Sequence, residues 1–226
     1  MPLLGLDTAT SHGSVALVRA GGVAALVDLK DRGAHARDLL ESIDRLLQEQ
    51  GLEPGDLAGI GVAAGPGSFT GVRVGMATAK GLSYALGIGL LGISTLEALA
   101  HAALLARPAH VGPICPIMES GRGEVYAALF LAGPEGLARP TPDRSLRPED
   151  LAPEIPAGAL LVGDGARRVS RGASADWAVL EPPPPIAGAI ALRAAERLDR
   201  AGGYRPGEAA PNYVRPSDAR APRLSP

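Results

Sequence analysis

A buried strand that must stop at a glycine-proline-glycine turn constrains this 226-residue chain more than any other feature. The run Leu57–Ala64 is short and apolar, which favours a buried strand, and Gly65-Pro66-Gly67 cannot continue a hydrogen-bonded ladder. Beyond the turn, apolar residues recur at helical spacing from Val72 to Leu86. A buried strand that leads directly into a helix is typical of the parallel part of an α/β sheet.

The residues around this unit predict further strands and helices. Three short strands come first, over Leu3–Leu6, Ser14–Arg19 and Val23–Leu29, and an amphipathic helix follows over Ala36–Gln50. The later elements expected are a strand at Leu90–Gly92, a helix that begins at a Ser94–Glu97 capping box, strands over Val111–Met118 and Glu124–Leu131, and a late helix over Ile186–Leu198. This order predicts an α/β fold with a mixed sheet of the ribonuclease-H-like kind.

The same order predicts two lobes. We expect residues 1–108 to form an N-terminal ribonuclease-H-like lobe, completed by the late helix and the C-terminal segment 186–226. Residues 109–185 are expected to form a smaller C-terminal lobe. Its segment 132–185 is rich in proline and has little clear periodicity.

Composition limits the classes of function. Lys and Arg total 22 against 24 for Asp and Glu, so no large basic field favours direct binding of nucleic acid. Cys115 is the only cysteine, and therefore no disulfide can form within the chain. No uninterrupted apolar run reaches the roughly 18 residues that a membrane span needs. We expect a cytoplasmic protein that has no membrane partner and meets RNA only indirectly.

Two turns carry residues that could bind a nucleotide phosphate. Asp7 and Thr8 end the first strand, where a turn can hold hydroxyls toward a phosphate, but an ordinary Asx or Ser/Thr turn explains the same residues. Gly67 and Ser68 precede a helix whose positive end can attract an anion, but Ser68 can instead cap that helix. Spacing alone leaves both alternatives open.

The sequence offers no complete catalytic or metal-binding set. A metal-dependent nuclease of this lobe type needs a carboxylate beyond the central strand, where this chain has Gly65-Pro66-Gly67. No two of its four histidines have the i, i+4 spacing with which one helix holds a metal ion, and a Gly-x-Ser-x-Gly nucleophile turn is missing. We expect no catalytic residue and no metal site.

The eleven residues Gly65–Gly75, Gly-Pro-Gly-Ser-Phe-Thr-Gly-Val-Arg-Val-Gly, resemble the signature of the TsaB family, also called YeaZ. Five further segments resemble that family in the same order: Leu6-Asp7-Thr8, His35-Ala36-Arg37, Gly92–Leu99, Gly123–Tyr126 and Pro211–Arg215. The chain departs from the family pattern at Glu119-Ser120-Gly121, where the family usually has Asp-Ala-Arg.

The resemblance implies two ribonuclease-H-like lobes of the actin, Hsp70 and sugar-kinase (ASKHA) type, with the second lobe reduced. It also implies a non-catalytic accessory or dimerisation subunit that binds and activates its paralogue TsaD, which transfers threonylcarbamoyl to adenosine 37 of tRNA. A TsaE-like ATPase joins such an assembly. The chain would need no cofactor of its own, because ATP and metal are expected on the partner subunits.

The resemblance places partner contacts on the two helices expected over Ala36–Gln50 and Thr70–Leu86. Small residues in one row would let another backbone approach closely, and leucines would supply apolar contact. The candidate interface residues are Leu39, Ile43, Leu46, Leu47, Gly71, Arg73, Gly75, Met76 and Ala79. The alternative is that both helices use all of their apolar surface inside the protein.

Three other functions stay open at this point. A nucleotide-binding or nucleotide-hydrolysing enzyme of the same fold would use the turns at Asp7, Thr8, Gly67 and Ser68. A glycoprotease-like peptidase would need a metal or nucleophile set. A homodimer with another binding role could form through the same pair of helices.

Overall fold

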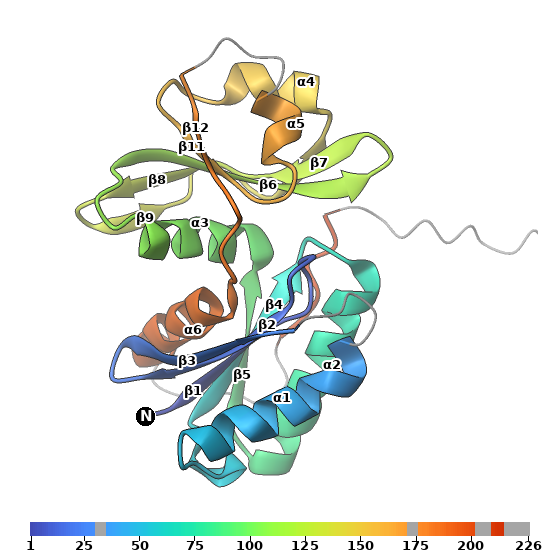
Figure 1. Cartoon of the computed structure of the whole chain (residues 1–226), viewed down its shortest axis with the longest axis vertical. Coiled ribbons are helices and arrows are strands. Elements are labelled where there is room, and N and C mark those ends of the chain that lie inside the picture. Colours follow the sequence, from blue (N-terminus) through green and yellow to red (C-terminus); the bar gives the residue numbers. More distant parts are fainter. Residues whose placement is uncertain (30–34, 171–175, 202–208, 215–226) are drawn as a thin grey trace, which may run out of the picture.

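Two β-sheets, one above the other, organise the computed structural model (Figure 1), which describes residues 1–29, 35–170, 176–201 and 209–214. The first sheet contains β1 (Leu3–Asp7), β2 (Ser14–Arg19), β3 (Gly22–Asp28), β4 (Gly59–Gly65) and β5 (Gly89–Ser94) in the order β3-β2-β1-β4-β5. Antiparallel pairs join β1, β2 and β3, whereas β1, β4 and β5 run parallel. This is the mixed sheet that the strand order predicts.

The second sheet has seven strands. They are β6 (Gly112–Gly121), β7 (Glu124–Ala127), β8 (Phe130–Gly133), β9 (Gly136–Ala138), β10 (Arg144–Leu146), β11 (Leu160–Val162) and β12 (Ala178–Leu180). The single strand expected over Glu124–Leu131 is wrong, because β7 and β8 pair with different halves of the long strand β6. Local sequence does not show this, since the break depends on which part of β6 each half meets.

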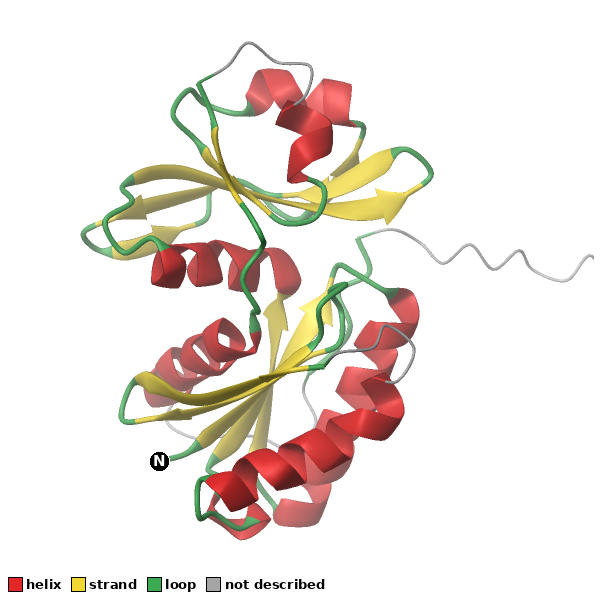
Figure 2. Ribbon diagram, in the orientation of Figure 1, coloured by secondary structure: helices red, strands yellow, loops and turns green. Residues whose placement is uncertain are grey.

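Helices cover both faces of the first sheet (Figure 2). The helices are α1 (His35–Glu49), α2 (Phe69–Leu86), α3 (Thr95–Ala106), α4 (Pro148–Leu151), α5 (Ala166–Ser170) and α6 (Ala187–Ala201), with short 3₁₀ turns at Pro54–Asp56 and Ala152–Glu154. The helices α1 and α2 lie together on one face, and α6 lies on the other. The helix α3 packs between α6 and the second sheet.

The late helix α6 approaches the first sheet through two glycines. A Cβ atom on Gly5 of β1 would lie 2.0 Å from the carbonyl oxygen of Ala187, and one on Gly61 of β4 would lie 2.9 Å from the Ala194 side chain. Gly5 and Gly61 are neighbours in the parallel ladder, so together they form a flat area that admits the helix. The lobe boundaries expected at residues 108 and 186 stay a prediction, and residues 202–208 and 215–226 of the expected C-terminal part lie outside the described residues.

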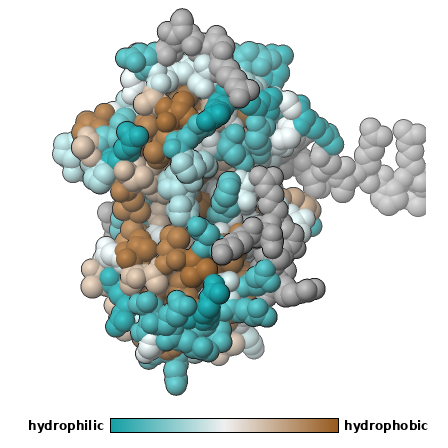
Figure 3. Space-filling view, viewed as in Figure 1, coloured by the Kyte–Doolittle hydropathy of each residue, from teal (hydrophilic) through white to brown (hydrophobic). Residues whose placement is uncertain are grey.

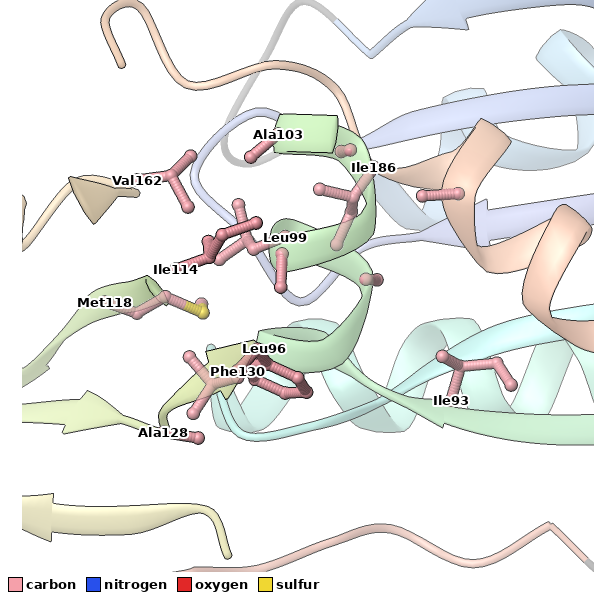
Figure 4. Packing of buried hydrophobic residues seen from close by; sticks show 14 of the residues in the cluster. Ile93, Leu96, Leu99, Ala103, Ile114, Met118, Ala128, Phe130, Val162 and Ile186 are labelled. Atoms are coloured by element: carbon pink, nitrogen blue, oxygen red, sulfur yellow. The ribbon is translucent and has the colours of Figure 1, made fainter. Parts of the chain in front are cut away.

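A single hydrophobic cluster joins the two lobes. Figure 4 shows Leu96 and Leu99 of α3 directed toward Phe130 of β8 and toward Ile114 and Met118 of β6. These five side chains are at most 4% exposed. Burial of large apolar side chains on this scale stabilises the arrangement of the lobes by several kcal/mol in order of magnitude.

The N-terminus of α3 forms only half of the capping box that the sequence predicts. The Ser94 hydroxyl accepts a hydrogen bond from the Glu97 backbone N–H at 3.3 Å, but the Glu97 carboxylate accepts hydrogen bonds from Arg193 and Arg197 of α6 instead. Burial raises the pKa of Glu97, but the two guanidinium groups outweigh that effect and hold it below its usual range. Glu97 therefore joins α3 to α6, which sequence spacing could not show.

Substitution at the α6 contact tests this packing. Gly5→Ala is expected to lower the free energy of unfolding by about 3 kcal/mol, because the added methyl group meets the Ala187 carbonyl. Gly22→Ala, at the start of β3 where nothing lies within 4 Å of the added atom, should change it by less than about 0.5 kcal/mol. Urea unfolding of both variants measures the difference, and equal effects would contradict the close approach of α6.

Candidate functional site

The turn after β1 is held together by its own aspartate. The Oδ1 atom of Asp7 accepts hydrogen bonds from the backbone N–H groups of Ala9 at 2.8 Å and Thr10 at 3.2 Å, and its Oδ2 atom accepts one from the Thr10 hydroxyl. Asp7 is fully buried. This geometry is that of an Asx turn, the ordinary explanation of these residues.

Burial also changes the titration of Asp7. Loss of hydration raises the pKa of its carboxyl from 3.8 to about 6, although the hydrogen bonds from Thr10 and Ala9 act in the opposite direction. The carboxyl thus titrates between acidic and neutral pH inside the first lobe.

The next residue, Thr8, rests on α2. Its hydroxyl donates a hydrogen bond to the Gly71 carbonyl at 2.6 Å. A Cβ atom on Gly71 would lie 1.8 Å from the Thr8 carbonyl oxygen, and one on Gly75 would lie 2.3 Å from the Thr8 hydroxyl. The small-residue row on α2 does admit a closely approaching backbone, but that backbone belongs to the same chain.

Gly67 and Ser68 complete this internal contact. The Ser68 backbone N–H donates to the Ala9 carbonyl at 2.8 Å, and the Ser68 hydroxyl accepts from the Gly71 N–H at 3.2 Å as the N-cap of α2. A Cβ atom on Gly67 would lie 2.5 Å from the Ala9 carbonyl oxygen. The backbone N–H groups of Ala9, Thr10, Ser68 and Gly71 all donate to acceptors inside the protein.

A cleft of about 290 Å³ lies next to these turns, between the two lobes. The first lobe contributes Ala9, Thr10, Ser11, Gly67 and Ser68 to its lining, and the second contributes Met118, Glu119 and Asp164. Among these described lining residues, none has a basic side chain. A polyphosphate in this cleft would face two carboxylates without a lining cation to balance its charge.

The two acidic residues of the cleft already have partners. The Glu119 backbone N–H donates to Asp164 Oδ1 at 2.9 Å, and the Glu119 carboxylate accepts from the Arg168 guanidinium at 2.7 Å. Glu119 is the first residue of the segment that departs from the family pattern. It therefore ties the end of β6 to α5.

Within the ranges that the structure describes, no three His, Cys, Asp or Glu side chains gather closely enough to hold a metal ion. Of the described histidines, His12 hydrogen-bonds Ser11 at the surface and His110 lies near the Pro113 carbonyl. Among the described helices, none combines the length and apolar character needed to cross a bilayer.

Most of the predicted interface residues lie inside the first lobe, which corrects that part of the prediction. They belong to the hydrophobic cluster between the helices and the sheet: Leu39, Ile43, Leu46, Leu47, Met76 and Ala79. Gly71 and Gly75 face Thr8. Only Arg73 of the nine is exposed, because the apolar stripe of each helix is used to cover its own sheet.

The outer face of α2 carries a different set of residues. Five of its exposed residues are Phe69, Arg73, Ala77, Gly81 and Tyr84, and Tyr84 is 87% exposed; Thr70, Lys80 and Ala85 are exposed as well. On α1, Leu40 is 53% exposed, while Figure 3 shows mainly hydrophilic residues over the outer side of that helix. We call the five α2 residues and Leu40 the outer helix face.

The predicted interface omits most of this face, although the sequence contains a signal for it. Ala77 and Gly81 lie two positions beyond Gly75 and Ala79, which is about 200° around a helix with 3.6 residues per turn. Once one row of small residues is assigned to the sheet, the second row must point outward. The burial of Ala79 and the exposure of Gly81 agree with that assignment.

At the start of α2, an arginine stacks on one aromatic ring and bonds to the hydroxyl of another. The Arg73 guanidinium carbon lies 3.6 Å from the centre of the Phe69 ring, and Arg73 Nε donates to the Tyr213 hydroxyl at 3.1 Å. The Phe69 and Tyr213 ring centres are 5.7 Å apart. A cation over the face of a ring is a favourable arrangement, and with the hydrogen bond to Tyr213 it fixes the direction of the guanidinium group.

Comparisons with known proteins agree with this architecture. The family model described as TsaD, tRNA N6-adenosine threonylcarbamoyltransferase, matches residues 29–169, more than half of the chain. The tRNA threonylcarbamoyladenosine biosynthesis protein TsaB of Bacillus subtilis is 35% identical over 147 residues, which cover 65% of this chain and 62% of that protein. The protein of the same name from Buchnera aphidicola is 30% identical over 173 residues, which cover 75% of this chain and 81% of that protein.

Solved structures show the same likeness. YeaZ from Pseudomonas aeruginosa superposes with a TM-score of 0.83 and 28% identity, covering 94% of this chain and 99% of that chain. The Acidaminococcus fermentans (R)-2-hydroxyglutaryl-CoA dehydratase component A shares the fold alone, with a TM-score of 0.51 and 11% identity over 87% of this chain and 98% of that chain. The first curated relatives are matched over 62%, 52% and 58% of their own length, so the chain spans less than two thirds of each.

The two facing sheets and these likenesses define a two-lobed α/β protein of the actin, Hsp70 and sugar-kinase class, which confirms the expected fold class. Within that class, the chain belongs to the TsaB (YeaZ) family. The resemblance found in Gly65–Gly75 and the later segments is thereby confirmed.

Protonation of Asp7 gives a testable pH dependence. The folded state binds this proton more tightly than the unfolded chain does, so its contribution to stability is complete below about pH 4 and is lost as the pH rises through about 6. Between these limits, the free energy of unfolding of the wild type relative to Asp7→Asn is expected to fall by up to about 3 kcal/mol. Urea unfolding across this pH range checks the prediction, and a constant difference would contradict it.

Proposed function

We propose that this chain is a non-catalytic subunit that binds a TsaD-like catalytic subunit and activates it for threonylcarbamoyl transfer to adenosine 37 of tRNA. The observation that carries the proposal is the contrast between two surfaces. Asp7 and Glu119 beside the interlobe cleft have partners inside the protein, whereas the outer helix face exposes aromatic, apolar and small residues, Tyr84 most of all.

The cleft supports a non-catalytic role. A general acid or base must reach a reacting group, but Asp7 is buried in its own turn and Glu119 is paired with Arg168. The lining residues supply no basic group for a phosphate. A nucleotide-hydrolysing enzyme built on this cleft would therefore lack charge compensation at the phosphates.

The outer helix face supports a protein partner. Tyr84 and Phe69 are exposed aromatic residues of the kind that anchor interfaces, and Ala77 and Gly81 allow a second helix to approach α2 closely. Leu40 adds an apolar contact from α1. In the absence of the catalytic subunit, the same face would serve a homodimer.

The other components of the reaction are assigned to the partners. We propose that metal and ATP are bound by the TsaD-like subunit and a TsaE-like ATPase, and that tRNA reaches this chain only through them. The near balance of 22 basic and 24 acidic residues supports this assignment, because a surface without a large positive field attracts RNA weakly.

Omission of the chain from a reconstituted reaction tests the proposed function. The reaction contains a TsaD-like subunit, its ATPase, tRNA and threonylcarbamoyl-adenylate. Without this chain, its transfer rate is expected to be at least about tenfold lower, which corresponds to an activation free energy higher by about 1.4 kcal/mol. The chain alone should transfer nothing. Transfer by the purified chain, or an undiminished rate in its absence, would contradict the proposal.

Substitution of the exposed glycine on α2 tests the binding surface. Gly81→Leu is expected to weaken association with the TsaD-like subunit by more than about 1 kcal/mol through overpacking, while the fold is kept because nothing lies within 4 Å of the added Cβ. Gly22→Leu, at an equally open position on β3, is the matched control and should bind like the wild type. Calorimetric titration of both variants measures the effect, and unchanged binding by Gly81→Leu would exclude this face.

A further inference from the structure

A short segment near the C-terminus connects three parts of the molecule. Residues 209–214 lie beside the end of β4, between the lobes, and appear in red in Figure 1. Ala209 is buried in the hydrophobic cluster of the first lobe, and the Asn212 backbone N–H donates to the Ala64 carbonyl at 2.6 Å. We call residues 209–214 the strap.

The side chain of Asn212 reaches the second lobe. Its Nδ2 atom donates to Asp143 Oδ2 at 2.7 Å, and Asp143 lies just before β10. The same carboxylate accepts hydrogen bonds from Arg139 at 2.6 Å and from Ser94 at 2.9 Å. A single carboxylate, with its side chain 3% exposed, thus joins the second lobe, the start of α3 and the strap.

Because the Asp143 carboxylate is buried, it depends on the hydrogen-bond donors around it. Loss of hydration raises the pKa of Asp143, while Arg139 and the hydrogen bonds from Ser94 and Asn212 lower it in part. A buried carboxylate is stable only while such donors stay in place. The Asn212 side chain is therefore held at a defined distance from the second lobe.

The next residue of the strap lies on the outer helix face. Tyr213 contacts Phe69 and accepts the hydrogen bond from Arg73, and both rings are partly exposed, Phe69 at 43% and Tyr213 at 47%. Arg73 is exposed and has no carboxylate partner within the described residues. Its planar group, held over the Phe69 ring and bonded to the Tyr213 hydroxyl, suits a bidentate contact with an acidic side chain.

We propose that the partner-binding surface extends beyond α2 to Tyr213, and that the Asn212–Asp143 bond holds Tyr213 in the binding position. This inference rests on the proposed function, and its occupant is the TsaD-like subunit, with an acidic side chain set against Arg73. Because Asn212 and Tyr213 are adjacent, a shift of the second lobe at Asp143 moves Tyr213 as well. Partner binding then depends on the relative position of the lobes.

The test compares two substitutions on the second lobe. In Asp143→Asn, one amide oxygen replaces two carboxylate oxygens that face three donors, and binding of the TsaD-like subunit is expected to weaken about tenfold. Glu154→Gln is the matched control, since it removes a carboxylate that pairs with Arg144 on the same lobe without contacting the strap. The control should bind within about twofold of the wild type.

Two variants of the strap separate a binding effect from a folding effect. Asn212→Ala removes an exposed side chain and should weaken binding about as much as Asp143→Asn does, and Tyr213→Ala should weaken it at least as much. Hydrogen exchange in the free chain gives a reading that needs no partner. The Asn212 N–H, which is bonded to Ala64, should exchange faster in Asp143→Asn than in the wild type.

The possible outcomes distinguish this inference from the proposed function. If the wild type fails to bind the TsaD-like subunit, the proposed function is wrong and the inference falls with it. If the wild type binds and Asn212→Ala and Tyr213→Ala bind equally well, the proposed function survives and the inference is overturned. Faster exchange of the Asn212 N–H in Asp143→Asn with unchanged partner binding would also overturn the inference. In that case the strap would be loosened without any effect on binding.

Discussion

The rest of the structure depends on one contact, in which Thr8 packs directly against Gly71 and Gly75 of α2. Gly71 and Gly75 leave no room for a Cβ atom, so the turn after β1 lies directly against the helix. This close approach lets the Thr8 hydroxyl donate to the Gly71 carbonyl and the Ser68 N–H donate to the Ala9 carbonyl. It also turns the opposite side of α2 toward solvent.

The chemistry of the interlobe cleft follows from that contact. In a fold of this class the turns after β1 and β4 face the cleft, but here their N–H groups serve the turns themselves. The second lobe adds Glu119 and Asp164 rather than a cation. The same backbone framework that could surround a polyphosphate therefore presents carboxylates and hydroxyls, which shows why the fold alone does not define an activity.

The two lobes are joined by contacts of different kinds. Apolar side chains of α3 pack against β6 and β8, and Asp143 gathers donors from both lobes and the strap, whereas the Glu97 carboxylate binds two arginines of α6 within the first lobe. The apolar contact is nondirectional, whereas the two carboxylates require particular geometry. The Asp143 hydrogen bonds therefore restrict the relative position in which the apolar surfaces of the two lobes meet.

The sequence by itself determined the order of strands and helices in the first lobe, the family and the lack of a regular metal-binding or nucleophile motif, because periodicity and short motifs are local properties. It could not decide which side of α2 faced inward, and the predicted interface of Leu39, Met76 and Ala79 proved to be core. Helical spacing identifies a stripe but not its neighbour. Only the tertiary structure decided that Gly71 meets Thr8 and that Tyr213 meets Arg73, since the hydrogen bonds that join these pairs span 63 and 140 residues of sequence.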